Sequence, residues 1–298
     1  MTATALRADF GPAGVRRSQK QMVWMRFRKH KAAMIGTAIL LLMGLATLLA
    51  PVIATHDPTR IGMPYCRNCP PSVDHWLGTD ELSRDIFSRL IYAGRVSLSV
   101  ALLSTLFGTM VGVLVGGFAG YYGGKIEMVL MRFTDVMLSL PGLPLLLIIS
   151  TLLGPGFKTI VIVLTLFGWM GVARLVHGSF LSLKAEAFTE AALALGASGR
   201  RIIFAHLLPN SLAPIIVAAT LSLGSAVITE ATLSFLGFGI PPRQASWGNM
   251  LQGAQTRIFQ NPLLAFYPGI AIFLVVLSAN FMGDGLRDAL DPRARAEK

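Results

Sequence analysis

Long apolar runs separated by short polar segments dominate this chain from residue 32 onward. At about 1.5 Å per residue, a run of roughly 20 residues crosses a hydrocarbon core of about 30 Å. The pattern therefore predicts an all-α integral membrane protein with six transmembrane helices. We expect these helices at residues 32–54, 96–118, 128 or 138–153, 159–180, 212–236 and 263–282. The start of the third is left open because Asp135 and a Pro-Gly-Leu-Pro cluster at 141–144 interrupt it.

Composition supports a membrane protein and argues against a soluble domain. Hydrophobic residues make up 53% of the 298 residues and charged residues 14%, and the mean hydropathy is +0.62. The formal net charge of +11 would suit nucleic-acid binding, but the basic residues are not interleaved with aromatic residues on a polar face. Membrane lipid is therefore an expected partner, and nucleic acid is not.

The distribution of lysine and arginine orients the spans. With the N-terminus in the cytoplasm, 18 of the 26 basic residues fall on that side, as the positive-inside rule requires. Both termini are then cytoplasmic, as a basic tail at 1–31 and a second tail at 286–298. The largest loop, 55–95, lies on the opposite side. Its second half has apolar residues at helical spacing from Ile86 to Ile91, which predicts an interfacial amphipathic helix leading into the second span.

The segment between the fourth and fifth spans, 184–210, has the pattern of a rigid projection. Apolar residues at helical spacing in its first half predict a short amphipathic helix. Gly196 is expected to end that helix, Ser198 to cap a second one, and Pro209 to end the second. Such a projection can dock another protein, or it can be an ordinary helical hairpin at the membrane interface.

Six residues of this segment resemble the EAA motif of permease subunits of ABC-type importers. They are Glu190, Ala191, Ala192, Gly196, Leu208 and Pro209. The family usually has an aliphatic residue two positions before the Leu-Pro pair, where this chain has His206. The resemblance implies the type I ABC importer permease fold, with a core of five helices at 96–285. It also implies that 184–210 is a cytoplasmic coupling loop inserted into a groove on an ATPase subunit, with Glu190 as a polar anchor, Gly196 as a close-approach turn and the two alanines allowing a close fit.

Three further strings resemble the permeases that import dipeptides, oligopeptides or nickel. They are Gly-Thr-Asp-Glu-Leu-Ser-Arg-Asp at 78–85, Ser-Trp-Gly-Asn-Met-Leu at 246–251 and Gly-Asp-Gly-Leu-Arg-Asp-Ala-Leu-Asp-Pro-Arg at 283–293. The resemblance covers nearly everything after about residue 75. The tail and the first outer loop are therefore expected to be specific to this chain.

The resemblance implies a permease subunit in the bacterial inner membrane that forms half of the pathway for di- or oligopeptides. Its expected partners are a second, related permease chain in a heterodimer, two ABC ATPase subunits and an extracytoplasmic substrate-binding protein. The sequence has no G-x-x-x-x-G-K-[ST] motif, no nucleophile elbow and no paired metal-ligand motif. We therefore expect no enzymatic activity, cofactor or metal in this chain, with ATP and Mg²⁺ bound by the ATPase partners. The alternatives are import of nickel or another small solute, an ion-coupled secondary transporter, and a membrane scaffold.

Two features within the spans have candidate roles. Glu230 lies inside the fifth expected span, where an ionisable group is costly unless it faces a partner or water. It can line the translocation path, or it can be a structural hydrogen-bonding group against a neighbouring helix, which is the interpretation we favour. Gly108, Gly112, Gly116 and Gly120 recur every four residues in the second span and predict a close packing seam, either static or sliding.

Cys66 and Cys69 form a C-x-x-C pattern in the 55–95 loop and are the two cysteines of the chain. In an oxidising extracytoplasmic compartment, we expect a disulfide within this short loop. A redox-active pair would normally lie in a thioredoxin-like strand and helix pattern, which the surrounding sequence lacks. A metal site would need ligands from elsewhere, and His56 and His75 in the same loop are candidates.

Overall fold

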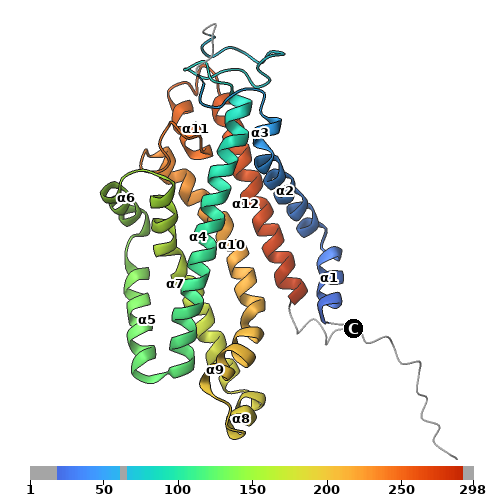
Figure 1. Cartoon of the computed structure of the whole chain (residues 1–298), viewed down its shortest axis with the longest axis vertical. Helices are drawn as coiled ribbons and strands as arrows, with labels where there is room; N and C mark the ends of the chain where they lie inside the picture. Colours follow the sequence, from blue (N-terminus) through green and yellow to red (C-terminus); the bar gives the residue numbers. More distant parts are fainter. Residues whose placement is uncertain (1–18, 61–65, 291–298) are drawn as a thin grey trace, which may run out of the picture.

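The computed structural model describes residues 19–60 and 66–290 (Figure 1). Within these ranges the chain is helical, with no strand and one isolated β-bridge between Thr79 and Asp85. Most of the predicted tail 1–31 and the end of the tail 286–298 lie outside the described residues. The helices, in chain order, are α1 (Gln19–Lys29), α2 (Lys31–Leu48), α3 (Ala50–Ile53), α4 (Ile86–Tyr122), α5 (Gly124–Ser139), α6 (Gly142–Leu153), α7 (Phe157–Lys184), α8 (Ala187–Ala194), α9 (Gly199–Arg201), the π-helix η1 (Ile202–Leu207), α10 (Leu208–Phe235), α11 (Trp247–Gln255) and α12 (Leu263–Leu290).

The long helices lie side by side along the long axis of the molecule (Figure 1). Five of the described helical segments are long and apolar enough to cross a membrane, and the bent pair α5 and α6 makes a sixth span if it is counted as one. The prediction of an all-α membrane protein is therefore confirmed. α8 and α9 lie at one end of the bundle, and α11 lies at the other end with the loop at 66–85 (Figure 1). We call these the α8 end and the α11 end.

The glycine seam predicted for the second span lies on α4, against α7. A Cβ at Gly112 would lie 2.7 Å from the carbonyl oxygen of Trp169, and one at Gly116 would overlap the carbonyl oxygen of Ala173. The two helices therefore touch along their backbones. Because lipid supplies no hydrophobic drive between helices, such close van der Waals contact holds them together. The predicted packing seam is confirmed, and any larger side chain there would push α4 and α7 apart.

The third predicted span is bent rather than straight. α5 and α6 meet at 91°, and the break falls at Leu140 and Pro141. Leu140 has an extended backbone, with φ −77° and ψ 143°, as the residue before a proline prefers. Asp135 was wrongly expected to interrupt the span, since it lies within α5. Its Oδ1 is 2.6 Å from Nη2 of Arg174 on α7, so the charge is compensated without breaking the helix.

The second span begins earlier than predicted. α4 starts at Ile86, and the expected interfacial helix is the first part of this single helix of 37 residues. A buried charge near the start of this helix finds its partners outside it. Arg89 is only 5% exposed, its Nε lies 3.6 Å from Asp80 Oδ2, and its Nη1 donates to the carbonyl oxygen of Pro58 at 3.2 Å.

Parts of the two predicted tails are also helical. Residues 19–29 form α1, which packs on α12, and α12 continues through residue 290, past the predicted end of the core at 285. The cause is an apolar contact, because Phe27 of α1 is buried with Ala33 and Ala289 in one cluster. Within the described residues, these segments are therefore part of the helical bundle.

Candidate functional site

α8 and the turn after it form the projection at one end of the bundle (Figure 1). Gly196 has a φ of +78°. Its N–H donates to the Leu193 carbonyl oxygen at 2.9 Å, and the Ala197 N–H donates to that of Ala192 at 3.0 Å, which is the Schellman arrangement of a helix C-terminus. The predicted helix stop at Gly196 is confirmed. A Cβ there would meet nothing within 4 Å, so the positive φ, and not crowding within the chain, favours glycine.

α8 is fixed on one side and open on the other. Thr189 is fully buried, and its Oγ1 donates to the Leu183 carbonyl oxygen at the end of α7, at 2.8 Å. By contrast, Phe188 is 41% exposed and Leu195 is 89% exposed. Glu190 is exposed as well. An amphipathic helix ordinarily turns its apolar face toward the core, whereas apolar side chains of α8 point away from this chain.

The other motif residues lie on two elements. Ala191 and Ala192 are on α8, the first exposed and the second partly buried, whereas Leu208 and Pro209 begin α10. Pro209 was wrongly expected to end a separate short helix, because α9, η1 and α10 form one helical run from Gly199 to Phe235.

The π-helical turn explains how the helix passes this proline. The Leu208 N–H donates to the carbonyl oxygen of Ile203, five residues back, so the helix widens immediately before the residue that lacks an N–H. Ser198 occupies the expected N-cap position, at the start of α9, but its side chain makes no capping hydrogen bond.

Glu230 is fully buried within the bundle, and both oxygens of its carboxyl group accept hydrogen bonds. Ser97 Oγ on α4 donates to Oε2 at 2.8 Å, and Ser234 Oγ donates to Oε1 at 2.7 Å. Ser97 Oγ also accepts from the Trp247 N–H at 3.2 Å. This Glu230 node joins α4, α10 and α11. The sequence reasoning missed Ser97 and Trp247 as its partners, because they are distant in the chain and only the helix rotations bring them together.

The Ser-Trp-Gly-Asn string forms the start of α11. Ser246 and Asn249 make a capping box, in which side chain and backbone satisfy each other reciprocally. Trp247 is 2% exposed, and its Nε1 donates to the Leu90 carbonyl oxygen on α4 at 3.1 Å. The string therefore fixes α11 against the second span.

A cavity of about 220 Å³ lies between α4, α7 and α10. Its lining contains apolar side chains and six hydroxyl groups, from Ser104, Thr105, Thr109, Ser222, Ser225 and Thr229. The buried hydroxyls of Thr105 and Thr109 have no hydrogen-bond partner in the described part of the chain. Glu230 is not among the residues that line this cavity. The cavity is therefore polar without a charged group in its lining.

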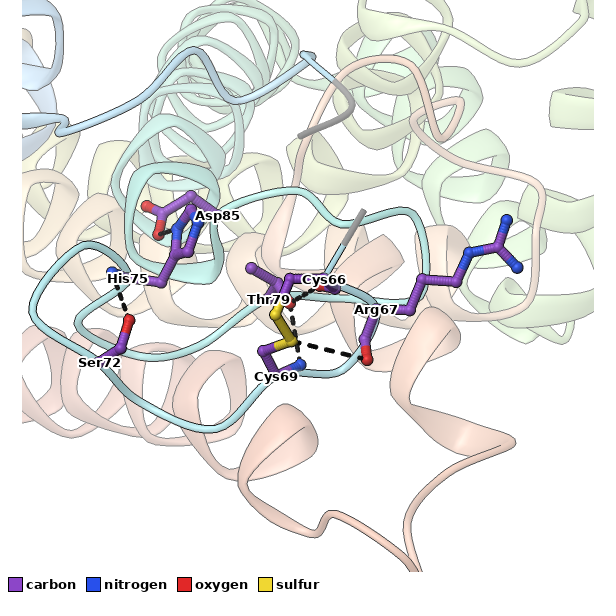
Figure 2. Close-up of a disulfide and its surroundings, with 7 residues drawn as sticks. All are labelled: Cys66, Arg67, Cys69, Ser72, His75, Thr79 and Asp85. Atoms are coloured by element: carbon purple, nitrogen blue, oxygen red, sulfur yellow. Dashed lines mark hydrogen bonds and ion pairs between the residues drawn. A yellow bond between two sulfur atoms is a disulfide. The ribbon is translucent and has the colours of Figure 1, made fainter. Parts of the chain in front are cut away.

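The loop at 66–85 is organised around Gly78 and Thr79, the first two residues of the string at 78–85 that resembles the peptide and nickel permeases. Figure 2 shows Cys66 and Cys69 joined by a disulfide next to Thr79. Thr79 Oγ1 donates to the Cys66 carbonyl oxygen and accepts from the Cys69 N–H at 3.0 Å. Gly78 has a φ of +81°, and a Cβ there would overlap the Cys69 carbonyl oxygen. The string thus holds the disulfide loop against the start of α4.

Asp85 is the residue before the first turn of α4 and is buried. Its Oδ2 accepts from the Ser88 N–H at 2.8 Å, and its Oδ1 lies 2.9 Å from His75 Nδ1 (Figure 2). Burial raises the pKa of Asp85, but hydrogen bonds from Ser88 and His75 outweigh it, so the pKa lies below its ordinary value. Asp85 is therefore a carboxylate at neutral pH.

A bundle of membrane-crossing helices with a helical projection at one end defines the class, a multi-pass helical membrane protein. Comparison with protein families agrees. Residues 112–296 match the family described as binding-protein-dependent transport system inner membrane component, and residues 18–71 match the N-terminal TM domain of oligopeptide transport permease C. The chain belongs to this family and is an inner-membrane protein. The second match corrects, for residues 18–71, the expectation that the tail and the first outer loop are specific to this chain.

Individual relatives cover nearly the whole chain. The dipeptide transport system permease protein DppC of Bacillus subtilis (strain 168) is 42% identical over 279 residues, which is 93% of this chain and 87% of that protein. The oligopeptide transport system permease protein OppC of the same strain is 37% identical, covering 91% and 88%. The glutathione transport system permease protein GsiD of Escherichia coli O157:H7 is 39% identical, covering 91% and 90%.

Solved structures show the same fold. An inward-facing structure of the MetNI methionine ABC transporter has a TM-score of 0.58 at 22% identity, over 69% of this chain and 98% of that chain. An amino acid ABC transporter with histidines has a TM-score of 0.52 at 19% identity, over 70% and 94%. The predicted ABC importer permease fold is therefore confirmed.

Proposed function

We propose that this chain is the permease subunit of an ATP-driven ABC importer for di- or oligopeptides and forms half of the translocation pathway. The relatives at 37–42% identity carry the names of dipeptide, oligopeptide and glutathione systems. These substrates share the amide group and differ in their side chains. Import of nickel or of another small solute is the alternative, and uptake of a labelled dipeptide against labelled nickel distinguishes the two.

The hydroxyl-lined cavity is our candidate for this chain's part of the pathway. A hydroxyl can both donate and accept a hydrogen bond, so Thr105 and Thr109 can pair with the N–H and C=O groups common to all peptides. A lining without charged residues makes no selection by side-chain charge. We assign Glu230 to structure rather than to the pathway, because its carboxyl group is occupied by two serines.

The coupling role is supported chiefly by one observation, the exposed apolar face of α8 beside Glu190. Thr189 ties the back of α8 to α7, and the Schellman turn at Gly196 leads directly into the helical run of α10. A partner that binds the exposed face and moves would therefore displace α8 together with both long helices. We propose that this partner is a cytoplasmic ATPase subunit with a groove for α8, which would place the α8 end and both termini in the cytoplasm.

The assembly that follows contains four further chains. We propose a heterodimer with a second, related permease, two ATPase subunits that bind ATP and Mg²⁺, and an extracytoplasmic binding protein at the α11 end. This chain then contributes no catalytic group to ATP hydrolysis. A membrane scaffold would have no use for a docking element for an ATPase, so co-purification without an ATPase would favour a scaffold.

Affinity purification of the full chain from native membranes tests the proposal. Wild-type protein is expected to recover a second permease and two ATPases, and Glu190→Lys is expected to lose the ATPases. The matched control is Asp74→Lys, which makes the same reversal of charge at an exposed residue of the 66–85 loop. Absence of an ATPase with wild-type protein in mild detergent, or equal recovery with Glu190→Lys, would overturn the coupling proposal.

A further inference from the structure

Two histidines and one buried carboxylate converge beside the start of α4. One donor atom from each of His56, His75 and Asp85 lies within 4.8 Å of the other two. The two imidazole rings have centroids 4.6 Å apart, and Figure 2 shows the His75 ring facing Asp85. We infer that these three side chains form a binding site for a divalent transition-metal ion of the zinc class at the α11 end.

The distances are close to those that a zinc ion requires. Zinc lies about 2.0–2.2 Å from nitrogen and oxygen ligands in tetrahedral geometry, which places neighbouring ligand atoms roughly 3.4 Å apart. His75 Nδ1 and Asp85 Oδ1 are 2.9 Å apart, and the third donor is within 4.8 Å of both. His56 is exposed, so rotation of its side chain can close the remaining distance. The ion would replace the hydrogen bond between His75 and Asp85 with two coordinate bonds.

The backbone around the three ligands is already held in place. The His56 N–H donates to Ser88 Oγ at 3.0 Å, and the His75 N–H donates to Ser72 Oγ at 3.0 Å (Figure 2). The second oxygen of Asp85 accepts from the Ser88 N–H, which fixes the carboxylate and leaves Oδ1 directed at His75. Ligands fixed by such supporting hydrogen bonds bind a metal more tightly than mobile ones.

The donor set determines the class of ion. Imidazole nitrogens with one carboxylate suit zinc, copper and neighbouring transition metals, whereas Ca²⁺ and Mg²⁺ prefer sets of oxygen ligands. Three protein ligands leave one coordination position open to water or to an external ligand. Since Cys66 and Cys69 are joined in a disulfide, their sulfurs are not part of the donor set. A bound ion would tie the segment after α3 to both the 66–85 loop and the start of α4.

Zinc titration of the purified full chain, under non-reducing conditions in detergent, tests the site. Competition with a chromogenic chelator is expected to show one tight Zn²⁺ per chain, and Zn²⁺ is expected to raise the Tm. His56→Gln should weaken binding by at least about 10-fold, because loss of even an outer-shell partner typically costs 10–100-fold. The Tm of metal-free His56→Gln should equal that of the metal-free wild type, because the side chain is exposed.

Two controls and a spectroscopic readout locate the ion. His206→Gln on η1 removes a histidine far from the site, and Asp74→Asn removes an exposed acid next to His75; both should bind zinc like the wild type. Cobalt in the site should show d–d bands without a thiolate charge-transfer band. Zinc affinity in His56→Gln equal to wild type, absence of saturable binding, or a thiolate band from the cysteines would each overturn the inference.

Discussion

The two ends of the bundle differ in the side chains that define them. At the α11 end, Thr79, Asp85, Arg89 and Trp247 are all buried, and each has hydrogen-bonding or ionic partners in this chain. At the α8 end, apolar side chains lie exposed on the short helix α8 and at its C-cap residue, Leu195. An exposed apolar surface on a projecting element marks a site for a partner. The α11 end is therefore organised by buried contacts within this chain, whereas the α8 end presents an exposed apolar surface on a projecting element.

One glycine at each end shows a related difference in how crowded the backbone is. Gly78 at the α11 end and Gly196 at the α8 end both have positive φ, of +81° and +78°. A Cβ at Gly78 would run into the backbone of the disulfide loop, whereas one at Gly196 would meet nothing within 4 Å. A larger residue would therefore be strained by the positive φ at both positions, but it would also be crowded at Gly78.

Gly78→Ala is expected to have the largest effect on stability. A left-handed conformation and an overlap with the Cys69 carbonyl oxygen act together, and we expect a loss of about 3 kcal/mol or more. Thermal unfolding of the purified chain measures the loss, and faster reduction of the disulfide locates it in the 66–85 loop.

Gly253→Ala is the matched control for Gly78→Ala at the same end of the molecule. Gly253 lies in α11, and a Cβ there would meet nothing within 4 Å. The substitution should leave the Tm unchanged or raise it slightly, because alanine favours a helix by about 0.5–1 kcal/mol over glycine. Equal losses in the two variants would contradict the steric explanation.

Glu230→Ala should have the next largest effect. It leaves the hydroxyls of Ser97 and Ser234 without their acceptor inside the bundle, at a cost of about 2 kcal/mol. Glu230→Gln keeps the shape and one acceptor oxygen, and its amide can donate to a serine oxygen, so most of the stability should return. Thermal unfolding and peptide uptake are measured together for both variants. Loss of uptake in Glu230→Gln with normal stability would instead assign the charge of Glu230 to the translocation path.

The spans were predictable because a long apolar run in lipid has essentially one option, a helix that satisfies its own backbone. Where charges lie near a span, the sequence alone misleads. The pattern from Ile86 to Ile91 predicted a separate interfacial helix, but Asp80 and Pro58 compensate the charge of Arg89 from outside the helix, and α4 runs through. Likewise, Asp135 suggested a break that Arg174 makes unnecessary. Such partners come from distant segments, and hydropathy contains no information about them.

The candidate site also has features that the sequence predicts and features that it does not. The turn at Gly196 was predictable because a helix end depends on a few consecutive residues. The passage of the helix through Pro209 was not, because it depends on the π-helical turn at η1. The node at Glu230 and the cavity near Thr105 and Thr109 require the rotation of each helix about its axis, which hydropathy leaves undetermined.

Gly196→Ala tests the effect of the positive φ at the α8 end alone, because a Cβ at this position meets no other atom within 4 Å. The left-handed conformation alone should cost about 1 kcal/mol, and this cost should fall on the local unfolding of α8 rather than on the bundle. Hydrogen exchange of the α8 amides is expected to accelerate while the Tm changes little. Gly196→Asn should accelerate it less, because asparagine tolerates positive φ better than alanine. Equal exchange rates in wild type and Gly196→Ala would show that the Schellman turn does not hold α8.

Leu195→Ser should have the smallest effect on stability and a clear effect on assembly. The side chain is 89% exposed, so the free energy of unfolding should change by less than about 0.5 kcal/mol. If α8 is completed by an ATPase subunit, the same change removes apolar contact area from that interface, and recovery of the ATPase on purification should fall. Val73→Ser is the control, because Val73 is 92% exposed in the 66–85 loop at the α11 end and should leave ATPase recovery unchanged. Equal ATPase recovery in all three proteins would mean that exposure at the α8 end, like that of Val73, is ordinary surface, and the contrast between the two ends would lose its functional meaning.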